Sequence, residues 1–110
     1  MEIKQRGING IVILDFDGDL ETNTALDAEN YLAKLIVENV PKILLNFEKL
    51  EYISSAGLRV LLGTAKQLEA KSGVLRICSL NETVQEIFEI SGFCSILNVS
   101  PTEQEALDCF

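Results

Sequence analysis

The sequence predicts an α/β fold: a mixed, mostly parallel sheet of four to five strands, with an antiparallel hairpin at its N-terminal edge and about four helices. Residues 2–6 alternate polar and apolar side chains, and Asn9-Gly10 is a hairpin-turn signal before the apolar run 11–14. Beyond this hairpin, strand-like and helix-like segments alternate, which favours parallel strands joined by right-handed crossovers. The 110 residues, 47% of them hydrophobic, are expected to form a single domain over 1–110.

Three further segments have the length and composition of strands. Residues 42–47 form an apolar run that suits a buried strand, residues 74–78 form the next, and residues 95–99 form a short last one. Gly18 is expected to close the second strand of the hairpin. The acidic segment around it, residues 14–20, is interpreted as a solvated turn before a helix.

Two long helices are expected to pack on this sheet. The first begins at a capping residue, Thr22 or Thr24, and ends before Pro41, and the second ends at Gly73. Their apolar residues recur at the spacing of one helix face. These residues are Ala28, Tyr31, Leu32, Leu35 and Ile36 in the first helix, and Leu58, Leu61, Leu62, Ala65 and Leu68 in the second.

Two shorter helices are expected near the C-terminus. Asn81 caps the first of them, which carries Val84, Ile87 and Phe88 and ends at Ser91-Gly92. The segment Ser100-Pro101-Thr102-Glu103 reads as a capping box with proline at the first helical position. The helix that follows is expected to bury Ala106 and Leu107.

The charge composition argues against nucleic-acid and membrane partners. Seventeen acidic residues against nine basic ones give a net charge of −8, which repels phosphate backbones and anionic lipid surfaces. No apolar run approaches the ~20 residues of a membrane helix. The N-terminus opens a strand pattern rather than a signal peptide, so a cytoplasmic protein is expected. Cys78, Cys94 and Cys109 are widely spaced and the chain lacks histidine, which predicts reduced thiols, no metal site and no cofactor.

Functional sites on such sheets gather where strand carboxyl ends meet helix N-termini. Two junctions qualify, residues 15–24 and residues 48–57. The second junction holds two adjacent serines, Ser54 and Ser55, where an apolar strand hands over to an amphipathic helix. These serines are the most informative residues of the chain, because their role decides the function.

Two roles are open to such a serine. Its oxygen can cap the free N–H groups of the first helical turn. Alternatively its hydroxyl can receive a phosphate, which would face those N–H groups and the positive end of the helix dipole, and Gly57 is expected to leave room for it. A Ser-His-Asp triad is excluded by the absence of histidine, and the spacing of Lys49 and Lys66 indicates no Ser-Lys pair.

The first junction raises an enzymatic alternative. The segment Asp15-Phe16-Asp17-Gly18 after an apolar strand resembles the haloacid-dehalogenase phosphatases, where Asp15 would be the nucleophile and Asp17 the general acid, with magnesium nearby. Asp19 stands where that family usually has threonine, and no acidic pair follows a later strand. A Mg-dependent phosphatase is therefore kept only as a remote alternative.

Three segments together resemble the STAS domain of the bacterial anti-sigma factor antagonists. Residues 18–25 resemble the family's Gly-Glu-Leu-Asp-x-x-Thr-Ala motif. Residues 42–63 resemble its central strand, phosphorylation loop and helix, and residues 87–93 resemble its late helix and Ser-Gly-Phe turn. The resemblance covers nearly the whole chain at the right spacings, and the STAS fold agrees with the order of elements given above.

The resemblance implies partner switching in transcription regulation. Such proteins bind an anti-sigma factor that is also an ATP-dependent serine kinase, which releases a sigma factor. Phosphorylation ends the binding, and a serine phosphatase resets the antagonist. The phosphorylated serine of the family corresponds to Ser55, and no catalytic residue is implied.

Two departures from the family motif keep alternatives open. Ser54 replaces the family's aspartate and competes as an acceptor, while Ala56 replaces a second hydroxyl residue. The missing aspartate motivates a second hypothesis, a STAS scaffold without phosphorylation or a transporter accessory subunit. The expected docking face for the anti-sigma factor comprises nine residues: Asp19, Glu21, Thr22, Asn23, Ser54, Ser55, Ala56, Gly57 and Arg59.

Overall fold

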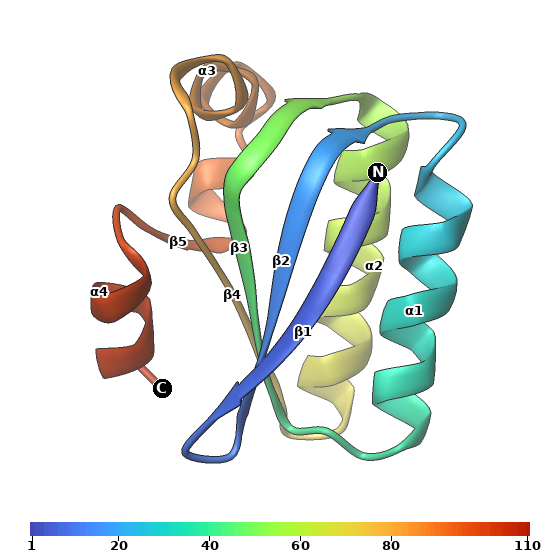
Figure 1. Ribbon diagram of the computed structural model, residues 1–110, viewed down its shortest axis with the longest axis vertical. Coiled ribbons are helices and arrows are strands. Elements are labelled where there is room, and N and C mark those ends of the chain that lie inside the picture. The colour runs from blue at the N-terminus through green and yellow to red at the C-terminus, as the bar shows by residue number, and fades with distance from the viewer.

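A five-stranded sheet in the order β1-β2-β3-β4-β5 forms the centre of the computed structural model, which describes residues 1–110 (Figure 1). The strands are β1 (Glu2–Ile8), β2 (Ile11–Leu20), β3 (Lys42–Ile53), β4 (Val74–Cys78) and β5 (Asn98–Ser100). The helices are α1 (Ala25–Val37), α2 (Ser55–Ala70), α3 (Glu82–Ser91), the short 3₁₀ helix η1 (Phe93–Ser95) and α4 (Glu103–Asp108).

The predicted sheet type is confirmed. β1 and β2 pair antiparallel, whereas β2, β3, β4 and β5 pair parallel to one another. The hairpin turn between β1 and β2 has φ angles of 51° at Asn9 and 81° at Gly10, the left-handed conformation that Asn-Gly adopts readily. The hairpin therefore places the N-terminal strand at the edge of the sheet, as its alternating pattern predicts.

The two long helices cover one face of the sheet, and α4 lies against the other (Figure 1). The main core lies under α1 and α2 and includes the edge-to-face pair Phe16 and Phe47, whose ring centroids are 5.2 Å apart. A smaller apolar cluster lies under α4. Its buried members are Ile11, Ile13, Leu44, Cys78 and Ala106.

Strands β2 and β3 extend beyond their predicted ends. The predicted acidic turn within residues 14–20 is wrong, because pairing between the two strands continues as far as Leu20 and Ile53, with register shifts on the way. Phe16 and Leu50 alternate with charged residues and point into the core, and this burial holds the charged stretch in the sheet. A single residue, Ser54, therefore separates the end of β3 from the start of α2.

Two predicted boundaries near the C-terminus differ from the structure. Residues 95–97 are not strand, since η1 occupies Phe93–Ser95 and β5 starts at Asn98. The capping residue of α4 is Thr102, whose Oγ1 accepts the N–H of Glu105 at 3.2 Å. Pro101 consequently precedes the helix instead of starting it.

The helix caps are confirmed in part. Asn81 caps α3 by accepting the N–H of Val84 at 2.8 Å, and Gly92 ends that helix with a φ of 79°. After α2, Ser72 takes the left-handed conformation, with a φ of 61°, in place of Gly73. Gly73 is needed there for a different reason, because a Cβ atom on it would lie 2.8 Å from the carbonyl oxygen of Pro41.

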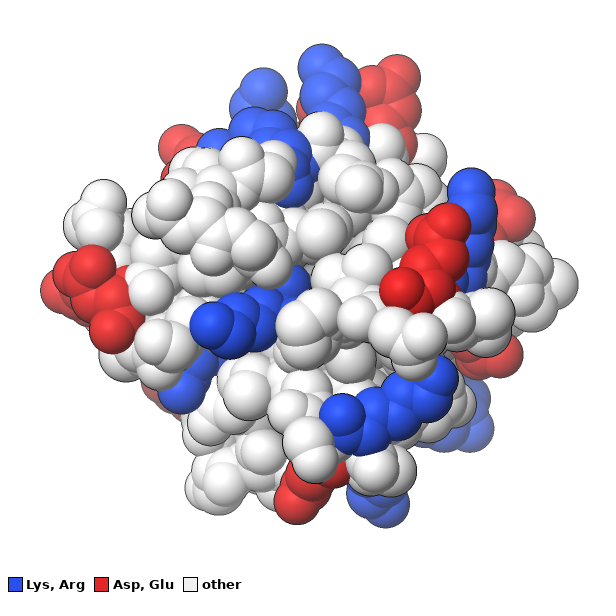
Figure 2. Space-filling view, turned by 90° about the horizontal axis from the view of Figure 1, so that it is seen from below, with Lys and Arg blue, Asp and Glu red and all other residues white.

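The end of the molecule that carries the helix C-termini bears dispersed basic side chains. Figure 2 shows this end, with Lys and Arg side chains spread among uncharged surface and several Asp and Glu side chains. Lys71, at the C-cap of α2, donates to the carbonyl of Ile36 at the end of α1, at 3.0 Å. A cation at this position complements the negative end of the helix dipole.

An ion-pair network ties the C-terminal helix to the sheet. Arg6 on β1 bonds the carboxylate of Asp15 through Nε at 2.6 Å and Nη2 at 2.8 Å, and it also pairs with Glu103 at the start of α4. Asn46 donates to the same Glu103 carboxylate at 3.0 Å. These hydrogen bonds, chiefly the one from Arg6, lower the pKa of Glu103.

The lowered pKa of Glu103 predicts a pH-dependent contribution to stability. The contribution is present above the unfolded pKa of about 4.3 and is lost as the pH falls through the lower folded pKa. We expect Glu103→Gln to lower the free energy of unfolding by ~1 kcal/mol at pH 7 and by much less at pH 3. Urea unfolding at both pH values measures this difference.

Glu105→Gln is the matched control for this prediction. Glu105 lies on the same helix, is exposed and makes no ion pair. Its replacement should alter stability little at either pH. An equal effect of Glu103→Gln at pH 7 and pH 3 would contradict the role of the network.

Candidate functional site

The two predicted junctions meet at the end of the molecule where α1 and α2 begin (Figure 1). The last residues of β2 and β3 pair, Asp19 with Tyr52 and Leu20 with Ile53. The N–H of Ser54 then donates to the carbonyl of Leu20 at 2.9 Å. The segment between β2 and α1 is thereby held beside the start of α2.

The two serines occupy different environments. Ser54 is the N-cap of α2 and is half-buried, and its Oγ accepts the N–H of Gly57 at 3.4 Å. Ser55 is the first residue of the helix and is exposed, and its hydroxyl makes no hydrogen bond within the protein. The sequence left two roles open for these serines, helix capping and phosphate acceptance. In the structure Ser54 is the cap, and Ser55 has the hydroxyl that is free.

The N-terminus of α2 is electropositive, and no acidic side chain of its first turn offsets this positive potential. Leu58 is the first residue whose N–H reaches a backbone carbonyl, that of Ser54 at 2.9 Å. The N–H groups of Ser55 and Ala56 have no acceptor in the protein, and the first turn contains no acidic residue. An anion attached at this end would meet free donors and the positive end of the helix dipole.

Gly57 serves an internal contact. It is buried, and a Cβ atom built on it would lie 2.8 Å from both the Leu20 carbonyl oxygen and Ile53 Cγ1. The missing side chain lets α2 start directly against the end of β2. The expectation that this glycine leaves room for an external phosphate is therefore wrong, since the space it leaves faces the core.

The segment between β2 and α1 is ordered by its own hydrogen bonds. Thr24 Oγ1 accepts the N–H of Glu21 at 3.0 Å and donates to the carbonyl of Asp19 at 2.7 Å. Glu21 Oε1 accepts the N–H of Asn23 at 3.0 Å. Thr24 stands at the N-cap position of α1, but its hydroxyl makes no capping bond, in contrast to the prediction.

The predicted residues form a surface of mixed exposure. Asp19, Thr22 and Asn23 are exposed on one segment, and Ser55 and Arg59 are exposed on the other. Glu21, Ser54 and Ala56 are half-buried, and Gly57 is buried.

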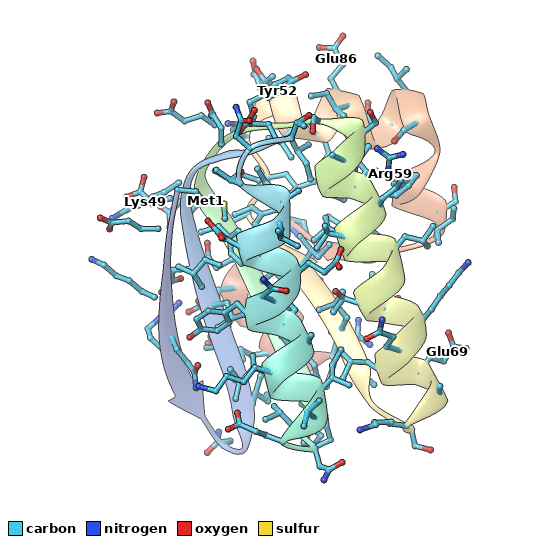
Figure 3. The ribbon with its side chains drawn as sticks, turned by 90° about the vertical axis from the view of Figure 1, so that its right-hand side faces the viewer. Met1, Lys49, Tyr52, Arg59, Glu69 and Glu86 are labelled. Carbon is cyan, nitrogen blue, oxygen red and sulfur yellow. The ribbon has the colours of Figure 1, made fainter.

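Sequence reasoning missed Tyr52, which is 46% exposed at the end of β3 and lies at the same end of the molecule as Arg59 (Figure 3). Because β3 was predicted to end at Phe47, no strand alternation was available to place Tyr52 outward. An exposed aromatic ring next to this surface is a natural addition to a protein-docking face.

The aspartates of the phosphatase alternative lie within β2. Asp15 is held by two hydrogen bonds from Arg6, and no group of three His, Cys, Asp or Glu side chains is placed to hold a metal ion. A hollow of about 880 Å³ lies beside these aspartates and is lined by the sheet, by residues 79–81 after β4 and by the start of α4. None of the nine predicted docking residues lines it.

Two further features concern the cysteine thiols and the length and hydrophobicity of the helices. The three cysteines form no disulfide; Cys78 is buried, and this burial raises the pKa of its thiol. None of the helices is long and apolar enough to cross a membrane.

Comparison with known proteins places the chain in a family. The STAS domain pattern matches residues 2–106. A relative from Bordetella bronchiseptica, named "Putative anti-sigma factor antagonist BtrV", is 38% identical over 110 residues, which cover 100% of this chain and 95% of the relative. The chain belongs to the STAS domain family, as the sequence resemblance implies.

Solved structures agree with this assignment at the level of the fold. A crystal structure of a Thermotoga maritima protein, described as a "putative anti-sigma factor antagonist", superposes with a TM-score of 0.91 at 21% identity, covering 96% of this chain and 92% of that one. The anti-sigma factor antagonist SpoIIAA in its unphosphorylated form gives a TM-score of 0.73 at 22% identity, covering 97% and 96%. SpoIIAA of Bacillus in the phosphorylated form also gives 0.73, at 24% identity and 97% coverage of both chains.

Gly57→Ala tests the contact that sets the start of α2. The added methyl group must displace a backbone carbonyl, so we expect the free energy of unfolding to fall by about 1–3 kcal/mol. Gly63→Ala is the matched control, because Gly63 lies on the same helix with nothing within 4 Å of its added Cβ. That variant should gain about 0.5–1 kcal/mol from helix propensity. Urea unfolding measures the free energy of unfolding of both variants. Equal values for Gly57→Ala and Gly63→Ala would contradict the role of this contact.

Proposed function

We propose that this protein is an anti-sigma factor antagonist that is switched off by phosphorylation of Ser55. In this proposal it binds an anti-sigma factor that is also an ATP-dependent serine kinase, and the binding releases a sigma factor. The observation that carries the proposal is the exposed, unbonded hydroxyl of Ser55 at the N-terminus of α2. Membership of the STAS family and the names of BtrV and SpoIIAA support it.

The docking face in this proposal consists of the start of α2 and the segment between β2 and α1. The two are already aligned by the bond from the N–H of Ser54 to the carbonyl of Leu20. The internal bonds of Thr24 hold the second segment in one conformation. A surface ordered before binding loses less conformational entropy when a partner docks.

Phosphorylation would end binding by charge and size. A phosphate adds a charge of about −1.5 to −2 to Ser55, and it must be desolvated when a partner docks over it. The phosphate would also repel any acidic group that a partner places against this face. A penalty of ~2–4 kcal/mol weakens binding by about 30- to 1000-fold, which suffices for a switch.

The fold should accept the phosphate without rearrangement. The free N–H groups of Ser55 and Ala56 can receive the charge locally. The proposed switch therefore acts at the docking face rather than through refolding.

Ser55 is preferred over Ser54 as the acceptor. The Ser54 hydroxyl is half-buried and already accepts a hydrogen bond as the N-cap, whereas the Ser55 hydroxyl is free. Phosphorylation of Ser54 would have to break that cap. The replacement of the family's aspartate by Ser54 leaves the kinase to recognise other features of the face.

Further parts of the proposal concern partners and location. A serine phosphatase would reset the protein, which would itself catalyse no reaction. It would bind neither nucleic acid nor membranes directly, in line with its net charge of −8. The cytoplasm, where sigma factors act, is the proposed location.

Phosphorylation by the cognate anti-sigma kinase tests the assigned acceptor. Wild type, Ser55→Ala and Ser54→Ala are incubated with the kinase and ATP, and phosphate incorporation is measured by intact mass. We expect about one phosphate on wild type and Ser54→Ala and none on Ser55→Ala.

Circular dichroism serves as the folding control, since Ser54→Ala removes a cap worth ~1 kcal/mol. Equal incorporation into wild type and Ser55→Ala would eliminate Ser55 as the acceptor. A complete lack of phosphate on every form would favour the alternative of a STAS scaffold without phosphorylation.

A further inference from the structure

Arg59 lies one helical turn beyond Ser55 on α2. Both residues are exposed near the start of α2. Figure 3 labels Arg59 at this end of the molecule. The guanidinium of Arg59 makes no hydrogen bond, and both ion pairs of the protein are made by Arg6. An exposed hydroxyl and an unpaired cation therefore stand four residues apart on one helix.

We propose that Arg59 is the intramolecular counter-ion of a phosphate on Ser55. This inference rests on the proposed phosphorylation of Ser55 and specifies how the modified site is organised. Side chains at positions i and i+4 are neighbours on a helix surface, and an acid placed before the base is the favourable order. The planar guanidinium matches phosphate oxygens with paired hydrogen bonds, which lysine cannot reproduce.

Arg59 is the only basic residue in the first two turns of α2. The neighbouring elements contribute acids: Asp19 from β2, Glu21 from the segment after it, Glu51 from β3 and Glu29 from α1. The next basic residue on α2 is Lys66, two turns further along the helix.

Glu29 is the acid that could compete for Arg59. Both residues line a small hollow of about 180 Å³ between α1 and α2, and no ion pair joins them. A phosphate on the same helix carries nearly twice the charge of this carboxylate at pH 7. The phosphate is therefore the stronger partner for the guanidinium.

The pair gives phosphorylation a second effect on the docking face. Arg59 is the only basic residue among the nine predicted docking residues. In the unmodified protein its guanidinium is free to meet an acidic group of a partner. Once Ser55 is phosphorylated, the same guanidinium is occupied, so the face loses its cation while it gains an anion.

A titration of the phosphate followed by ³¹P NMR tests this pairing. Phosphoserine is placed at residue 55 during synthesis of the full chain, so neither the kinase nor the anti-sigma factor is needed. The wild-type sequence is compared with Arg59→Gln, Arg59→Lys and Lys66→Gln. A nearby cation favours the dianion, so the second pKa of the phosphate should rise by ~0.5 unit in Arg59→Gln.

The control variants separate a specific pair from a change in overall charge. Lys66→Gln removes one positive charge from the same helix and should leave the phosphate titration unchanged. Arg59→Lys should give a value between those of wild type and Arg59→Gln. The proposal is overturned if Arg59→Gln titrates like wild type, or if Lys66→Gln shifts the titration as much. Because the phosphate is installed chemically, this result is independent of whether a kinase modifies Ser55 in the cell.

Discussion

The carbonyl oxygen of Leu20 sets the position at which α2 begins, and the candidate site depends on this one contact. It accepts the N–H of Ser54 at 2.9 Å, and a Cβ atom on Gly57 would lie 2.8 Å from it. The end of β2 thus fixes the first turn of a helix that follows a different strand. Ser54 is turned inward as the cap, and Ser55 is left at the surface.

This local arrangement links charge to the proposed switch. The first turn of α2 has free N–H groups and no acidic side chain, so it can accept a phosphate that the acidic remainder of the protein would repel. The proposed pairing with Arg59 adds a cation one turn away. A phosphate would then be stabilised within the helix and would change the docking face without disturbing the core.

Local signals in the sequence predicted much of the fold correctly. The Asn9-Gly10 turn, the cap at Asn81 and the periodic apolar face of α1 each depend on residues close together in the chain. The serine pair could be recognised because adjacent hydroxyls at a strand-to-helix junction are a short-range pattern. The position of Ser55 at the exposed start of α2 follows directly from it.

The features that the sequence did not reveal depend on contacts between distant segments. The length of β2 is set by its pairing with β3, which overrides the low strand propensity of Asp15 and Asp17. Gly57 and Gly73 are required by carbonyl groups of Leu20 and Pro41, which no local motif encodes. The exposed position of Tyr52 was not predicted, because it requires β3 to continue to Ile53, which also depends on pairing with β2.

The affinity of the anti-sigma factor for the unmodified and the Ser55-phosphorylated protein tests the central claim most directly. Calorimetric titration of both forms, with amide NMR spectra of each, separates a docking effect from refolding. The account predicts binding that is roughly 30- to 1000-fold weaker after phosphorylation, with amide shifts confined to residues near the start of α2. Equal affinity of the two forms, or amide shifts spread throughout the sheet, would contradict it.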